Sequence, residues 1–113
     1  QGPEPDLPAF SQSRYVDFMT FMAALIQNTS TPDLAHDLAE LTRMIRDAAG
    51  RGAAFVATPE YCAGLDTRDG KLFPVAHAEE EHPALPAFRS LASDLGLWLL
   101  IGSIGVKSPD GRI

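Results

Sequence analysis

Apolar residues occur in three compact runs along the chain, and amphipathic or polar segments separate these runs. The runs lie within residues 18–27, 53–58 and 97–106. Several consecutive apolar positions in so short a segment are typical of a strand that is covered on both faces, as in a parallel sheet. We therefore expect one strand at each of these three positions.

A first helix is expected over residues 31–50, between the first two runs. Its apolar positions recur with helical spacing and form one stripe: Leu34, Leu38, Leu41, Ile45 and Ala48. Thr31 is a suitable N-cap, and Pro32 suits the first helical position because its missing N–H would have no partner there. The charged positions, Asp37 among them, fall elsewhere and are expected at the surface.

A second helix is expected to start between Pro83 and Pro86 and to end at Gly96. Its inner face would consist of Phe88, Leu91, Ala92 and Leu95. Strands and helices then alternate as βαβαβ, an α/β arrangement in which the strands pair in parallel. Two helices cover only one face of such a sheet, so we expect the other face to expose apolar side chains.

Two segments carry turn signals without a periodic pattern. Residues 61–82 form a long irregular segment with a turn at Asp69 and Gly70. Residues 109–111 form a tight turn of the hairpin kind, so residues 112–113 would begin a fourth strand. The sheet would then have an unpaired edge at this point, as expected of the first part of a larger domain.

Charge and composition exclude several classes of function. The net charge is -6 and the isoelectric point is about 4.8, so the protein should bind neither nucleic acid nor a membrane surface. No apolar run approaches the roughly 20 residues that cross a bilayer. Cys62 is the only cysteine, which favours a reducing, cytoplasmic compartment. Residues 1–17 hold three prolines and should form a flexible arm.

Glu60 is the strongest candidate for chemistry because of its place in the pattern. The apolar run of residues 53–58 leads through Pro59 directly into this carboxylate. In open α/β sheets, ligand sites lie just beyond the carboxyl ends of strands. A charge beside so much apolar sequence also needs a function or a partner, since burying an unpaired carboxylate is costly.

Four segments in this order resemble the nitrilase superfamily of carbon–nitrogen hydrolases. They are residues 23–27 in the first strand, 55–60 in the second, 95–103 from the second helix into the third strand, and 108–113 in the final turn. A Pro-Glu pair after a strand is common by itself, but the ordered set at these spacings is fairly specific. The resemblance implies that residues 18–113 form the N-terminal part of a carbon–nitrogen hydrolase domain.

The resemblance also implies a fold and a mechanism. The family fold is a four-layer α-β-β-α sandwich, of which this chain would supply the first βαβαβ segment. The family hydrolyses small amides or nitriles with a Glu, a Lys and a Cys, without a metal or cofactor, and commonly as homo-oligomers. Glu60 matches the general base that activates the thiol. The matching Lys and Cys follow the final turn in the family, so the 113 residues alone should be inactive.

Other residues that could carry chemistry have simpler interpretations. Cys62 lies close to Glu60 in sequence, but the nucleophile of the family belongs to a later strand end, and a half-buried structural thiol is expected. Lys71 and Lys107 stand at turns and are expected to be solvated surface lysines. His77, His82 and the acidic residues 79–81 lack the spacing of a metal site and are expected to form a mobile loop.

A second class of function stays open at this point. Because the matching Lys and Cys are not among these residues, the chain could instead be a non-catalytic α/β module or fragment. Such a module would associate with a partner through its incomplete sheet.

Overall fold

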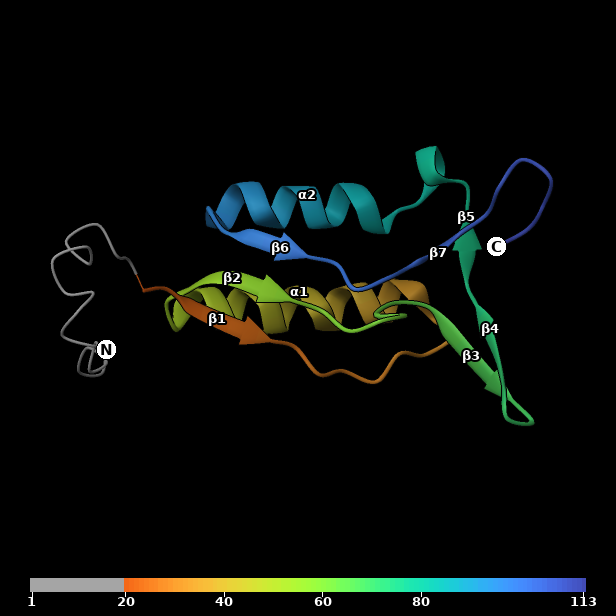
Figure 1. Ribbon diagram of the computed structural model, residues 1–113, viewed down its shortest axis with the longest axis horizontal. Coiled ribbons are helices and arrows are strands. Elements are labelled where there is room, and N and C mark those ends of the chain that lie inside the picture. The colour runs from red at the N-terminus through yellow and green to blue at the C-terminus, as the bar shows by residue number, and fades with distance from the viewer. Residues whose placement is uncertain (1–19) are drawn as a thin grey trace, which may run out of the picture.

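The computed structural model describes residues 20–113, so the arm expected over residues 1–17 lies outside the described residues (Figure 1). The strands are β1 (Met22–Leu25), β2 (Ala53–Ala57), β3 (Leu65–Arg68), β4 (Lys71–Pro74), β5 (Ala76–His77), β6 (Trp98–Leu100) and β7 (Gly105–Val106). The helices are α1 (Leu34–Gly50), α2 (Ala84–Leu95) and the short 3₁₀ helix η2 (Glu79–Glu81).

The centre of the structure is a three-stranded parallel sheet with the order β1-β2-β6. Helix α1 connects β1 to β2, and the segment containing α2 precedes β6, which gives the expected βαβαβ order. In Figure 1 both helices run alongside the strands, and α1 also packs against α2. The α/β class and the parallel pairing are therefore confirmed.

Helix α1 begins later than its sequence predicts. The N-cap is Asp33, whose side chain accepts a hydrogen bond from the His36 N–H at 3.0 Å, and the first helical residue is Leu34. The prediction of Thr31 as N-cap and Pro32 as first helical residue was wrong. The Thr31 hydroxyl instead donates a hydrogen bond to the Asp37 carboxylate at 2.7 Å, which is a charge-assisted bond, and the Asp33 side chain takes over as acceptor for the helix N–H.

The apolar faces of both helices are confirmed. Leu41 and Ile45 of α1 are fully buried, and Phe88 and Leu91 of α2 pack into the same cluster. Helix α2 ends as expected at Gly96, where φ is +62°, a conformation that glycine adopts without the steric penalty of a side chain. These side chains form the core between the helices and one face of the sheet.

The third expected strand is in fact two strands. Residues 98–100 pair with β2, and residues 105–106 pair in parallel with β5, which lies in a separate two-stranded ladder. Between them the chain leaves the sheet at Gly102, where an added Cβ would lie 2.4 Å from the Pro59 carbonyl carbon. The apolar run cannot continue as one straight strand because the chain must pass this backbone at close range.

The segment 61–82 is more regular than expected. It contains the antiparallel hairpin β3-β4, which turns at Asp69 (φ +50°) and Gly70 (φ +73°). Positive φ at both central residues matches the twist of a hairpin, which explains why this pair stands at its tip. At the end of the chain, Gly111 donates to the Ser108 carbonyl in a turn, but no strand starts at residue 112.

The two faces of the sheet differ, as the count of helices predicts. Val56 points into the helix-covered core, whereas Leu25, Trp98 and Leu100 are exposed on the opposite face. We call these three residues, with the cross-strand partners Phe55 and Ala57, the open face. The expectation that the face without helices exposes apolar side chains is confirmed for residues 20–113. The four-layer sandwich stays a prediction.

Candidate active site

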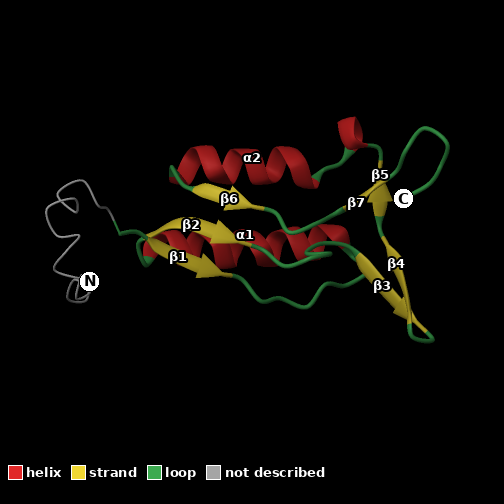
Figure 2. Ribbon diagram, viewed as in Figure 1, coloured by secondary structure: helices red, strands yellow, loops and turns green. Residues whose placement is uncertain are grey.

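The carboxyl ends of β1, β2 and β6 lie at one edge of the sheet because the three strands are parallel (Figure 2). The loops that follow the three strands come together at this edge. We call residues 58–64, which follow β2, the strap. Glu60 lies in the strap with its side chain exposed. The sequence prediction that this carboxylate stands at the end of a strand is therefore confirmed.

The strap begins with a fixed junction to β6. The Thr58 N–H donates to the Leu100 carbonyl at 2.9 Å, and the Thr58 hydroxyl accepts from the Gly102 N–H at 3.1 Å. Thr58 is buried, and the backbones of Gly102 and Pro59 are in direct contact. Glycine is required at position 102 by this close approach, because a side chain would collide with the Pro59 backbone.

The residues after Glu60 are held from two sides. Tyr61 has φ of +47°, an uncommon conformation for a residue with a side chain, and it needs support from its surroundings. Its N–H donates to the Ser103 hydroxyl at 2.7 Å, and its carbonyl accepts from the Ser30 hydroxyl. The backbone of Cys62 is also bound twice, by the Ser103 carbonyl at 3.2 Å and by the Asn28 side chain at 2.9 Å.

Asp37 is the functional candidate that the sequence analysis missed. It was expected at the surface, but it is 1% exposed and accepts hydrogen bonds from the backbones of Thr31 and Gly64, each at 2.8 Å. A signal was present in the sequence, because Asp37 lies at helical spacing between the buried Leu34 and Leu41. A carboxylate inside an apolar stripe indicates buried polar partners.

Glu60 faces a hollow of about 640 Å³ in this part of the structure. It is lined by Glu60, Tyr61, Pro74, Ser103, Ile104, Gly105, Val106 and Ile113. Among residues 20–113, Glu60 forms no salt bridge. Its carboxylate is therefore available to a reacting group, whereas an ion-paired carboxylate would be a weaker base.

Cys62 is not placed to act as a nucleophile. The side chain is fully buried rather than half-buried, and this burial raises the pKa of the thiol, against a smaller opposite effect of the hydrogen bond with Thr58. A buried thiol of raised pKa stays protonated and unreactive. Lys71 and Lys107 are exposed, as expected, and neither of them lines the hollow beside Glu60.

His77 at the end of β5 and His82 before α2 lie side by side, with His77 half-buried and His82 buried. The rings of His77 and His82 lie edge to face with their centres 5.2 Å apart, and His82 Nδ1 accepts from the Ala84 N–H at 3.2 Å. Burial lowers the pKa of His82, and the neighbouring His77 lowers it further. Across residues 20–113 no three His, Cys, Asp or Glu side chains gather in a way that could hold a metal ion.

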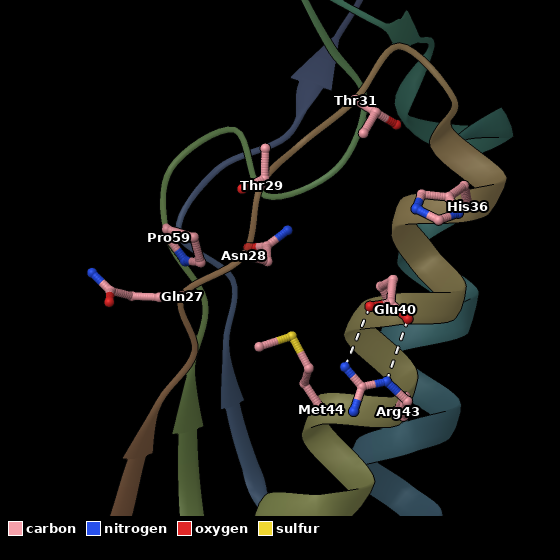
Figure 3. Close-up of a pocket in the computed structure, with 9 residues that line it drawn as sticks. All are labelled: Gln27, Asn28, Thr29, Thr31, His36, Glu40, Arg43, Met44 and Pro59. Carbon is pink, nitrogen blue, oxygen red and sulfur yellow. Dashed lines mark hydrogen bonds and ion pairs between the residues drawn. The ribbon is translucent and has the colours of Figure 1, made fainter.

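A second hollow of about 670 Å³ lies beside the loop that follows β1. Its lining is mostly polar and comprises Gln27, Asn28, Thr29, Thr31, His36, Glu40, Arg43, Met44 and Pro59 (Figure 3). Arg43 is paired with Glu40 of the same helix at 3.3 Å, and the pair is exposed. This pairing largely cancels the one positive charge that could attract an anion there, so the hollow offers weaker support for chemistry than the surroundings of Glu60.

The chain matches one protein family over most of its length. The family is described as carbon-nitrogen hydrolase, and the match covers residues 22–113, which include β1, the strap and both helices. The chain therefore belongs to the carbon-nitrogen hydrolase family. In the described part of the chain, no helix is long and apolar enough to span a membrane.

Proposed function

Starting from membership of the carbon-nitrogen hydrolase family, we propose that this chain is part of an amidase that acts on small linear amides, such as the ω-amide of a dicarboxylic acid. Glu60 would be its general base. The observation that carries the proposal is the placement of this exposed carboxylate on a strap whose neighbouring backbone groups are bonded on both sides. So well supported a turn fixes the backbone from which the base projects.

The proposed chemistry follows the family pattern of a Glu, a Lys and a Cys. Glu60 takes the proton of the cysteine thiol, and the thiolate attacks the amide carbon while the lysine stabilises the oxyanion. The C–N bond breaks, the amine leaves with a proton delivered by Glu60, and a thioester remains. Water activated by the same carboxylate then releases the acid and restores the thiol.

The Lys and Cys of this mechanism have no counterpart among the described residues. Cys62 is buried, and Lys71 and Lys107 lie away from the hollow beside Glu60. We propose that both groups come from polypeptide outside these 113 residues, so the 113 residues alone would not turn over substrate. A cytoplasmic homo-oligomer is the proposed working form.

The test is the release of ammonia by the intact gene product and by its Glu60→Gln variant. Gln keeps the size of the side chain but cannot accept the thiol proton, so kcat/KM should fall by about 10²–10⁴-fold. Glu79→Gln is a matched control, since Glu79 is also exposed and lies in η2. Unchanged turnover in Glu60→Gln would sink the assignment of the base.

The alternative function, a non-catalytic module, is favoured by the open face. Leu25 and Trp98 are 81% and 79% exposed, and adjacent apolar side chains on a sheet are typical of an interaction surface. Two measurements on the purified 113-residue chain test this function. Sedimentation gives its association state, and binding of an apolar dye reports how much apolar surface it exposes. A folded monomer that binds little dye would contradict association through this face.

A further inference from the structure

We propose that Asp37 is a positioning residue that sets the direction of Glu60 by holding the strap, an inference that rests on the proposed function. Asp37 lies in the first turn of α1 and does not approach the reacting atoms through its own side chain. Its carboxylate joins two segments that are far apart in sequence, the loop after β1 at Thr31 and the strap at Gly64.

The carboxylate is fully used by these contacts. Oδ2 accepts the N–H groups of Thr31 and Gly64, both at 2.8 Å, and Oδ1 accepts the Thr31 hydroxyl at 2.7 Å. All three groups are donors, so only an acceptor satisfies them. The position at the N-terminal end of α1 also favours negative charge through the helix dipole. The charge is therefore stabilised without a cationic partner.

The far end of the strap is held jointly by Asp37 and by the backbone at Val75. Gly64 has φ of +77°, and an added Cβ would lie 2.8 Å from Val75 Cβ, so the backbone already touches the next segment. The Gly64 carbonyl accepts from the Val75 N–H at 2.8 Å. Asp37 binds the N–H of the same residue, and the two bonds together fix both sides of this glycine.

Movement at Gly64 would reach Glu60 through the strap. Two of the contacts between them come from the same loop that Asp37 holds, because Ser30 binds the Tyr61 carbonyl and Asn28 binds the Cys62 carbonyl. Loss of the Asp37 carboxylate would therefore loosen both the strap and the loop after β1. Ser103 would then be the main remaining support of Tyr61, the left-handed residue that follows Glu60 directly in the strap.

The chemistry of the side chain predicts which substitutions are tolerated. In Asp37→Asn, the amide oxygen can replace Oδ2 and accept both N–H groups. The amide nitrogen can then donate to the Thr31 hydroxyl, which rotates to accept. In Asp37→Ala both N–H groups lose their buried acceptor. Asp37→Ser has a hydroxyl too short to reach both of them, and it serves as the second variant if Asp37→Ala does not fold.

Asp33→Ala is the matched control. Asp33 is an acidic residue at the same end of α1, and its side chain caps the helix through the His36 N–H, but it is exposed and does not touch the strap. Its removal weakens the helix end by a mechanism that leaves the strap contacts in place. It therefore separates a general loss of stability from a loss of positioning.

The experiment measures kcat, KM and amide hydrogen exchange in the intact protein, with Glu60→Gln in parallel. In Asp37→Ala, kcat should fall about 10- to 100-fold with KM nearly unchanged, since small misplacement of a catalytic group costs about this much. The N–H groups of Tyr61 and Gly64 should lose protection. In Asp37→Asn and Asp33→Ala, kcat should stay within about threefold of the value for the unmodified protein. This is well below the loss of about tenfold or more, equivalent to about 1.4 kcal/mol or more, that is expected for Asp37→Ala.

Two results would overturn the inference alone. The first is a kcat in Asp37→Ala equal to that of Asp33→Ala while Glu60→Gln is inactive. The second is a large loss of kcat in Asp37→Asn with protection at Gly64 retained, because the charge and not the contact would then matter. Full turnover in Glu60→Gln would instead overturn the proposed function, and the catalytic consequence of Asp37 would fall with it.

Discussion

The carboxyl ends of the strands, which we call the carboxyl edge, and the open face belong to the same small sheet. They differ in how many of their groups find partners among the described residues. At the edge, the backbone groups of Tyr61, Cys62 and Gly64 all have partners from other segments. On the open face, Leu25 and Trp98 have almost no covering atoms. The support of Glu60 is therefore built by the first βαβαβ unit itself, whereas one face of its sheet is left uncovered by that unit.

Magnitudes show which of the two regions has more to gain. Full burial of a tryptophan removes about 150–250 Å² from water, worth about 4–6 kcal/mol at roughly 25 cal/mol per Å². A typical hydrogen bond of the strap contributes about 0.5–1.5 kcal/mol net. Covering the exposed Trp98 could therefore stabilise the fold as much as several strap contacts, although it would add nothing to the direction of Glu60.

The largest expected effect comes from breaking the carboxyl edge at Gly102. In Gly102→Ala, the new methyl group would lie 2.4 Å from the backbone of Pro59, which cannot yield as a flexible side chain would. We expect a loss of about 4–5 kcal/mol in the free energy of unfolding, or failure to fold. Thermal and denaturant unfolding of the variant measure this loss.

Gly50→Ala is the control for this substitution. Gly50 ends α1, has open space around the position of a Cβ and no positive φ. Alanine should therefore be neutral there or stabilise by up to about 1 kcal/mol, as its helix propensity predicts. If Gly102→Ala were as stable as Gly50→Ala, the edge would not be the rigid junction described above.

The sequence predicts the parts of this comparison that depend on continuous patterns. The apolar runs identify β1, β2 and β6, the helical stripes identify α1 and α2, and Pro59 marks the point where Glu60 leaves the sheet. Their physical cause is local and repeats along the chain. The exposed face also followed from counting the helices available to cover the sheet.

The rest depends on contacts between distant segments and was not predictable in the same way. Strand β3 (Leu65–Arg68) has one apolar residue followed by three polar ones, which gives no strand signal. The two-residue pairing of β5 with β7 exists only because the tertiary fold brings them together. Asp37 was assigned to the surface because its charge outweighed its position on the stripe. Gly64 and Thr31, which give the carboxylate its partners, cannot be recognised from spacing alone.

A matched pair of leucines sharpens the contrast between the covered and open faces. Leu41 of α1 is fully buried and Leu25 of β1 is 81% exposed. Leu41→Ala should cost about 2–5 kcal/mol in the 113-residue chain, since it removes buried atoms and leaves a cavity. Leu25→Ala should change stability by no more than about 0.5 kcal/mol.

Denaturant unfolding of both leucine variants measures the difference. Equal costs in the 113-residue chain would contradict the open face and would mean that Leu25 is covered in solution. The same pair in the intact protein then reports directly whether additional polypeptide covers the face. In that case the cost of Leu25→Ala should rise towards that of Leu41→Ala.

The smallest expected effect concerns His82. In contrast to the backbone groups at the carboxyl edge, not all polar atoms around this side chain have hydrogen-bond partners. Its Nε2 and the Nδ1 of His77 are buried without a hydrogen-bond partner in the described chain. Burial lowers the pKa of His82 below its usual 6.5, so the folded state binds fewer protons than the unfolded state below that pH. The free energy of unfolding is therefore unaffected by His82 above pH 6.5, and it decreases as the pH falls from 6.5 towards the pKa of His82 in the folded state.

In His82→Asn, the amide oxygen can replace Nδ1 as acceptor for the Ala84 N–H, and it does not titrate. The decrease in unfolding free energy below pH 6.5 should therefore be shallower than in the unmodified protein, and denaturant unfolding across this range measures it. The unmodified protein, measured under the same conditions, is the reference. Identical slopes in the two proteins would show that His82 is protonated as easily in the folded chain as in the unfolded one, which would contradict its burial.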